Sequence, residues 1–130
     1  MVLVAAGAGL TLIGVFPNVL FPLLWLSPLL IIGSLQTWAG ERSVFTEIGA
    51  GDWRRAIAAA VAALICGLFW EMWNIHSLAK WKYSIPLVHH YQIFEMPILG
   101  FAGYLPFGLE CIVAGDLVTG VIQRFKSNPA

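Results

Sequence analysis

Long apolar runs separated by short polar stretches dominate the chain. Residues 2–16 carry no charged side chain, the breaker pair Pro17-Asn18 follows, and residues 19–38 form a second apolar run. Residues 53–75 and 97–123 are again largely apolar. About 20 helical residues, each rising 1.5 Å, cross a hydrocarbon core of about 30 Å. The pattern therefore predicts an all-α fold, a polytopic transmembrane helix bundle of about four membrane segments in a single domain, residues 1–130.

The four segments differ in how well each fits a spanning helix. Residues 53–75 are rich in alanine and leucine and contain no proline, which favours a continuous helix. Glycine and proline crowd the start of the last segment, so we expect that helix to be broken between Pro97 and Gly108. Residues 2–16 are short, and two interpretations stay open: a tilted span, or a re-entrant hairpin with the following run.

Composition and charge place the chain outside the range of soluble domains. Hydrophobic residues make up 59% of the sequence, and charged residues 11%, against about 25% charged in soluble domains. The formal net charge is zero, so nothing attracts nucleic acid, and we exclude it as a partner. Cys66 and Cys111 lie in apolar runs without metal-ligand spacing, which predicts buried free thiols.

The distribution of basic residues predicts an orientation. Arg42, Arg54 and Arg55 lie on the same side as the tail with Arg124 and Lys126 if all four segments span, whereas only Lys80 and Lys82 lie opposite. The positive-inside rule then places both termini in the cytoplasm of a bacterium, with the chain in the inner membrane. Aromatic residues that prefer the headgroup zone flank the third segment and are predicted interface anchors: Trp53, Trp70, Trp73, Trp81 and Tyr83.

Acidic residues inside the apolar segments need partners. Glu71, counted along the helix from Arg55, and Glu110, counted from Arg124, lie at similar depths from the same side of the membrane. Asn74 lies on the same helix face as Glu71. We expect a polar centre near the outer surface made by these three residues together with His76 and Glu95. The depth of Asp116 stays open, because it depends on where the last helix ends.

Two interpretations of the polar centre are possible. The acids either pair with nearby bases and indoles to lock the bundle, or they line a pocket in which Glu71, Glu95 and Glu110 are candidate catalytic acid and base groups. A metal site is not predicted, because Asn74 stands where a di-iron bundle needs histidine after Glu71. His89 and His90 are adjacent and point apart on a helix, so they do not supply one either.

Three short motifs carry a resemblance to other proteins. They are Trp70-Glu71-Met72-Trp73-Asn74, then Lys80-Trp81-Lys82-Tyr83 with Pro86, and then Phe94-Glu95-Met96-Pro97. Together these motifs resemble those of uncharacterised bacterial multi-pass membrane proteins, over about residues 52–115. The resemblance implies a membrane location and a correspondence to the C-terminal part of a longer architecture.

Size and composition favour a structural role. Four short segments enclose little interior volume, so we expect an accessory subunit that packs laterally against other membrane polypeptides in the lipid bilayer. The alternative is an intramembrane enzyme or carrier for a lipid-like molecule that uses the three acids. The sequence indicates no particular cofactor.

Overall fold

The computed structural model describes residues 1–83 and 91–127, and the protein is mostly helical (73%). Within these residues, five helices lie before residue 84, and two short strands and two helices lie after residue 90. In chain order the elements are α1 (Val2–Leu12), α2 (Pro17–Leu20), α3 (Leu23–Trp38), α4 (Val44–Gly49), α5 (Arg54–His76), β1 (Gln92–Ile93), β2 (Met96–Pro97), α6 (Ile98–Phe101) and α7 (Tyr104–Ser127). His89 and His90 lie outside the described residues.

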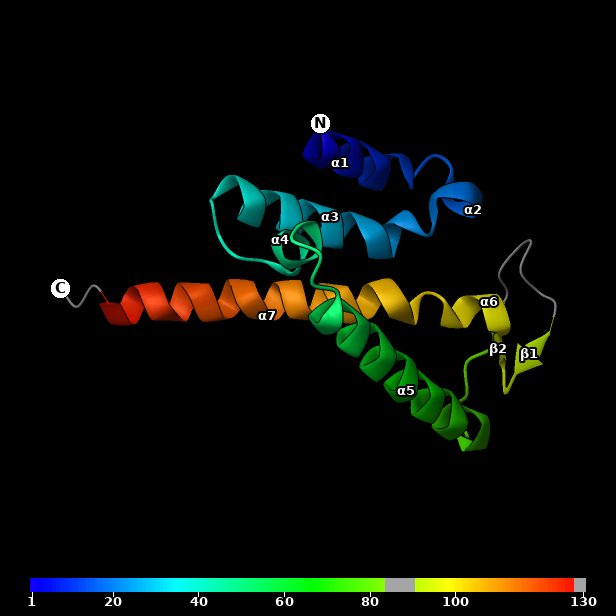
Figure 1. The fold of residues 1–130 in the computed structure, drawn as a ribbon. Coiled ribbons are helices and arrows are strands. Elements are labelled where there is room, and N and C mark those ends of the chain that lie inside the picture. Colours follow the sequence, from blue (N-terminus) through cyan, green and yellow to red (C-terminus); the bar gives the residue numbers. More distant parts are fainter. Residues whose placement is uncertain (84–90, 128–130) are drawn as a thin grey trace.

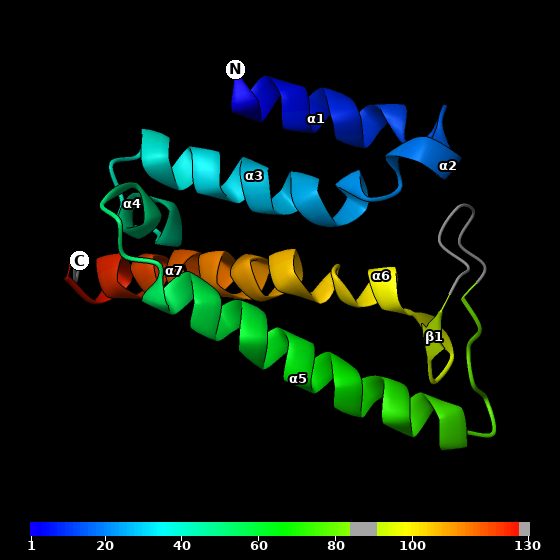
Figure 2. The same cartoon turned by 45° about the vertical axis from the view of Figure 1, so that its right-hand side comes forward.

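Helix α7 lies at the centre of the arrangement. Helix α5 packs on one side of it and α3 on the other, while α1 packs on the far side of α3 (Figure 1). A second view shows the same order, α1, α3, α7 and α5, with α4 beside the start of α5 (Figure 2). Helix α5 meets α7 near its own first turns and diverges from it toward its C-terminal end in both views.

Two helical stretches are long and apolar enough to cross a membrane. They are Arg54–His76, with a mean hydropathy of 1.8, and Ile98–Lys126, with 1.6, judged by length and composition. Only 17% and 11% of their most apolar windows are buried inside the protein. Helices α1 and α3 are apolar but shorter, at 11 and 16 residues. Residues 1–83 and 91–127 therefore contain two candidate membrane-spanning helices, and the larger number of spans predicted from the sequence stays a prediction.

The last apolar segment is interrupted inside the interval that the sequence indicates. Helix α6 ends at Phe101 and α7 begins at Tyr104, so the break falls at residues 102–103. Pro106 lies in the first turn of α7, where its missing N–H interrupts no helical hydrogen bond. The strands β1 and β2 form a two-stranded antiparallel hairpin that the all-α prediction did not include. Phe94 reverses the chain there with a positive φ of 57°.

The interior is small and relies on close backbone approach. Buried Leu29, Val44, Ala56 and Val113 form the hydrophobic core where α3, α4, α5 and α7 meet. A side chain at Gly108 would place its Cβ 2.4 Å from the carbonyl oxygen of Ala59, so only glycine allows this contact between α7 and α5. The prediction of buried thiols was wrong, because both cysteines are exposed on the outer surfaces of the long helices.

Candidate functional site

Helix α5 has two faces of opposite character. Its outward face is apolar and exposed, with Ile57, Val61, Ile65, Phe69 and Trp73 spaced four residues apart. Its inward face carries small and polar residues at the helical spacing, namely Ala59, Ala63, Gly67, Glu71 and Asn74. Apolar groups therefore point away from the protein, and the polar groups of this helix point into it.

Gly67 makes room for a tyrosine from α7. A Cβ at this position would lie 2.4 Å from the ring of Tyr104, so the ring rests directly on the helix backbone. Glu71 follows Gly67 by one turn on the same face, which brings the Tyr104 hydroxyl to the carboxylate. Phe101 of α6 packs beside the same ring, with the two ring centroids 6.0 Å apart.

Glu71 is completely buried and is held by neutral donors. Its Oε1 accepts hydrogen bonds from the hydroxyl of Tyr83 at 2.5 Å and from that of Tyr104 at 3.2 Å. The Tyr83 oxygen in turn accepts the indole N–H of Trp81 at 2.9 Å. Burial, reinforced by the hydrogen bond to Glu71, raises the pKa of the Tyr83 phenol above its usual range. The second carboxylate oxygen, Oε2, is buried and has no hydrogen-bond partner.

Asn74 fixes the segment that supplies Tyr83. Its side-chain amide donates to the Trp81 carbonyl at 3.0 Å, and its Oδ1 accepts the Trp81 N–H at 3.1 Å. The Trp81 ring stacks on Trp70 of α5, with centroids 5.3 Å apart. We call these residues the Glu71 site: Glu71, Asn74, Trp81, Tyr83 and Tyr104. Its geometry ties the end of α5 both to the following segment and to the start of α7.

Two other members of the predicted polar centre, Glu95 and His76, lie near this site but form no hydrogen bond or ion pair with Glu71 in the described structure. Glu95, between β1 and β2, accepts a hydrogen bond from Lys80 Nζ at 2.6 Å. This hydrogen bond lowers the pKa of the Glu95 carboxyl. His76 is exposed at the last position of α5. Of the predicted anchors, Trp53, Trp70, Trp73 and Trp81 are between 45% and 65% exposed.

Glu110 does not take part in the Glu71 site. The depths predicted from the sequence place Arg55 level with Arg124. In the structure Arg55 instead lies against Asp116, so the register of α5 and α7 is different. Counted from this ion pair, Glu71 lies about 24 Å along α5, but Glu110 lies only about 9 Å along α7. Glu110 is half-buried, and no described residue donates a hydrogen bond to it. The structure therefore does not bring the two carboxylates together.

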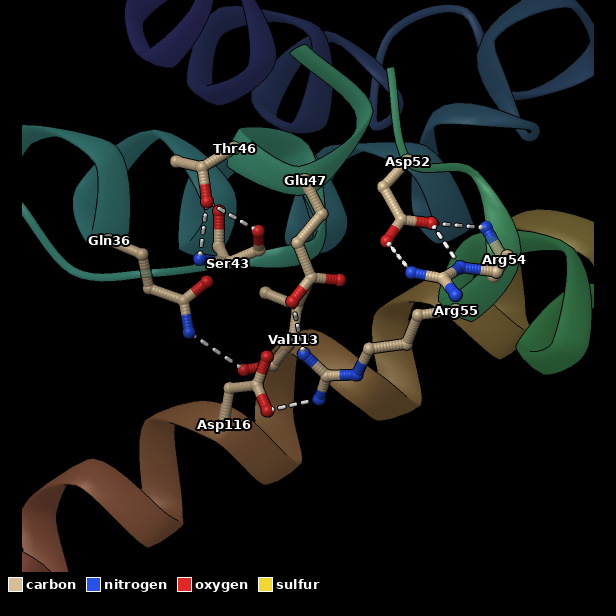
Figure 3. Close-up of polar contacts among 9 residues, drawn as sticks. All are labelled: Gln36, Ser43, Thr46, Glu47, Asp52, Arg54, Arg55, Val113 and Asp116. Carbon is tan, nitrogen blue, oxygen red and sulfur yellow. Dashed lines mark hydrogen bonds and ion pairs between the residues drawn. The ribbon is translucent and has the colours of Figure 1, made fainter. Parts of the chain in front are cut away.

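A second polar cluster joins α3, α4, α5 and α7 at the other end of α5 (Figure 3). Arg55 donates to Asp116 Oδ1 at 2.5 Å, and its other terminal nitrogen lies 3.6 Å from Glu47 Oε1. The buried Gln36 side chain of α3 donates to the Val113 carbonyl at 3.0 Å. We call Gln36, Ser43, Glu47, Arg55 and Asp116 the Arg55 junction. Asp116 is therefore paired with a base, while its depth in a membrane stays a question that this contact does not decide.

Exposed ion pairs surround this junction. Asp52 accepts the Arg54 N–H at 3.1 Å and the Arg54 side chain at 2.6 Å, and these hydrogen bonds lower the pKa of Asp52 to about 2. Arg124 of α7 pairs with Glu41 in the connection between α3 and α4. In the described part of the chain, no three His, Cys, Asp or Glu side chains lie close enough to hold a metal ion.

Sequence reasoning missed several of the residues in these two clusters. Tyr104, Gln36 and Glu47 were not singled out, and Tyr83 was interpreted only as an interface anchor. One signal was available for Tyr104: Gly67 precedes Glu71 by one turn, and a glycine beside a buried acid indicates that a bulky group approaches there. Comparison of the chain with models of known protein families, with curated proteins and with solved structures finds no match.

Proposed function

We propose that this chain is a small polytopic membrane protein that acts as an accessory or structural subunit and packs laterally against other membrane polypeptides. One observation carries the proposal: the two longest apolar helices bury only 17% and 11% of their most apolar windows. The core helix of a soluble protein would be mostly covered. These helices instead present their apolar faces to their surroundings, as a helix in lipid does.

The total exposed surface supports the same conclusion. The chain exposes 9146 Å², whereas a compact soluble monomer of 14.2 kDa exposes about 6,800 Å². The excess comes from an open arrangement in which α5 touches the rest mainly through one face. Surface of this kind needs a nonaqueous environment, a partner, or both.

Small residues on the outward side of α5 favour a protein partner in addition to lipid. Ala58, Ala62 and Cys66 are exposed and lie four residues apart on one side of the helix. Because lipid is as apolar as a leucine side chain, helices associate in membranes through close packing at such small residues. A neighbouring helix seated along this row would come near the backbone of α5.

A bulky apolar substitution tests lateral packing without disturbing insertion into lipid. We expect Ala62→Leu to release the chain from a larger complex, because leucine fills the space that the neighbouring helix needs. Ala8→Leu on α1 is the matched control, at an alanine that is also exposed. The measurement is the native mass after extraction in a mild detergent. A mass of one chain for the wild type at every concentration contradicts the proposal.

We further propose the bacterial inner membrane as the location, with both termini in the cytoplasm. The Arg55 junction supports this orientation, because it places the first turns of α5 beside the C-terminal half of α7. Arg42, Arg54, Arg124 and Lys126 thus belong to one end of the molecule. A fluorescent protein fused to the C-terminus should fluoresce, and alkaline phosphatase fused there should be inactive; the reverse pattern contradicts the orientation.

The Glu71 site supports a second candidate function, acid–base chemistry on a lipid-like molecule. The supporting observation is the buried Oε2 atom without a partner, beside two tyrosine hydroxyls. Only Glu71 of the three predicted acids belongs to this site, because Glu95 pairs with Lys80 and Glu110 makes no hydrogen bond with the described residues of the site. Lipid mass spectrometry of cells expressing the wild type, Glu71→Gln or Glu110→Gln tests it. A lipid species that changes with the wild type and equally with Glu71→Gln rules this chemistry out.

A further inference from the structure

Glu110 differs from every other acidic residue of the chain in its contacts. The structure describes all seven acidic side chains, and six of them contact a base or a tyrosine hydroxyl. These six are Glu41, Glu47, Asp52, Glu71, Glu95 and Asp116. Glu110 is half-buried and forms no hydrogen bond or ion pair with any described residue. A carboxyl group that is partly removed from water needs a partner, and the described chain does not supply one.

Glu110 also lies well inside the last apolar helical stretch. At 1.5 Å per residue it is about 18 Å from Ile98 and about 24 Å from Lys126, the two ends of the candidate span. Both distances exceed the length of a side chain, so the carboxyl group does not reach a headgroup layer at either end. Acidic residues inside spanning helices are rare and are normally paired. This step rests on the proposed function, because it applies to a chain that lies in a membrane.

An apolar stripe of α7 surrounds Glu110 on its own side of the helix. Phe107, Leu117 and Val121 are 39%, 40% and 45% exposed. Gly103 is exposed as well, and Ala114 is half-buried. Together with Glu110 they follow one another at alternating steps of four and three residues, which is the spacing of a helix seam that packs against a second helix. We call these residues the Glu110 stripe: Gly103, Phe107, Glu110, Ala114, Leu117 and Val121.

The Glu110 stripe is not the side of α7 that packs on α5. The backbone and ring contacts with α5 come from Gly108 and Tyr104, which helical periodicity places on a different side. Helix α3 borders the stripe, because Trp25 meets Phe107 edge to face with the ring centroids 6.1 Å apart. Trp25 itself is 49% exposed. A partner helix can therefore lie along the stripe beside α3 without displacing α5.

We propose that the Glu110 stripe docks a helix of another membrane polypeptide, and that this helix carries an arginine or lysine opposite Glu110. Charge complementarity supports the basic residue. A carboxylate and a cation form charge-assisted hydrogen bonds, and their pairing leaves neither charge alone in hydrocarbon. The small residues Gly103 and Ala114 on either side of Glu110 let the partner backbone come close. The inference adds a partner chemistry to the proposed accessory role.

A second copy of this chain does not provide the base. Helices α1, α2 and α3 contain no lysine or arginine, and neither do residues 56–76 or 98–123. Arg54 and Arg55 lie in the first turn of α5 and Arg124 in the last turn of α7. Arg55 already contacts two acids of its own chain. The basic helix therefore belongs to a different polypeptide.

Designed peptides test the pairing with the purified full chain in phosphatidylcholine vesicles. The probes are spanning helices of leucine and alanine with arginine, glutamine or leucine at the central position, each labelled with a dansyl group. Energy transfer from the six tryptophans of the chain to dansyl measures association. We expect the arginine peptide to bind the wild type about tenfold more tightly than the leucine peptide, because it gains a charge-assisted hydrogen bond.

Two variants make the test specific to Glu110. Glu110→Gln keeps the shape of the side chain and removes its charge, so it should bind the arginine and leucine peptides equally. Glu95→Gln is the matched control outside the stripe and should keep the tenfold preference. The inference is overturned if the wild type shows no preference, if Glu110→Gln keeps it, or if the glutamine peptide binds as tightly as the arginine peptide.

Flotation of the same vesicles separates this inference from the proposed function. A chain that floats with the vesicles but does not prefer the arginine peptide contradicts the basic partner alone. A chain that does not float contradicts the membrane location and the inference together.

Discussion

The Glu71 site and the Arg55 junction both join α5 to α7, but they use different chemistry. At the Glu71 site a carboxylate with 0% exposure accepts hydrogen bonds from tyrosine hydroxyls. At the Arg55 junction a guanidinium that is 43% exposed pairs with two carboxylates. A base beside Glu71 would bury a second full charge, which costs more than burying a hydroxyl that keeps a hydrogen bond. The protein thus uses neutral donors where water is excluded and charged pairs near its surface.

The largest difference between the two regions should appear when the buried acceptor is removed. Glu71→Ala leaves the hydroxyls of Tyr83 and Tyr104 without their acceptor, so we expect a loss of about 3 kcal/mol in the free energy of unfolding. Unfolding in mixed detergent–SDS micelles measures it. Glu110→Ala is the control, and should change this free energy by less than about 0.5 kcal/mol. Equal losses in the two variants would show that the hydroxyl contacts of Glu71 contribute nothing.

Asn74 allows the polar contacts of the Glu71 site to be tested without changing a charge. Asn74→Leu removes both hydrogen bonds to the Trp81 backbone, and we expect a loss of about 2 kcal/mol. Because the same contacts hold Trp81 on Trp70, tryptophan fluorescence should also change. Asn18→Leu, at an exposed position, is the matched control. Unaltered fluorescence in Asn74→Leu would mean that the stack forms without the amide.

The Arg55 junction should respond more weakly to loss of its base. Arg55→Met keeps the length of the side chain but leaves Glu47 and Asp116, which are partly exposed, without their base. We expect a loss of about 1 kcal/mol in the free energy of unfolding. In a double-mutant cycle with Asp116→Leu, the coupling should fall as choline chloride is added, because salt screens exposed charges. A coupling that is larger than the effect of Glu71→Ala would reverse the proposed contrast.

The smallest effect should be that of pH on the pair between Lys80 and Glu95. The folded-state pKa of Glu95 is lowered, so its contribution is complete above the unfolded pKa of about 4.5 and is lost as pH falls through the folded value. Since the carboxyl is at the surface, we expect a small decrease in stability on the acid side of pH 5. Glu95→Gln should lack this part of the pH profile. Identical profiles in the two proteins would contradict it.

The sequence predicted several local features because each depends on neighbouring residues. The alanine- and leucine-rich run gave a continuous helix, α5, and the glycine and proline cluster gave the break before α7. The sharing of a face by Glu71 and Asn74 follows from helical spacing alone. The hairpin of β1 and β2 escaped prediction, because two-residue strands leave no periodic pattern and Phe94 is not a usual residue for a positive φ.

The positions of partners along α7 were decided only by tertiary structure. From the sequence, Arg55 and Arg124 mark the same end of the molecule, which gave Glu71 and Glu110 one depth. In the folded chain Gly67 and Gly108 allow α5 and α7 to pack closely at Tyr104 and Ala59, and this packing sets the register of the two helices. Arg55 lies level with Asp116 and not with Arg124, which is a shift of about 12 Å along the helix axis. Loop lengths and charges do not encode this shift, because it depends on which side chains interlock.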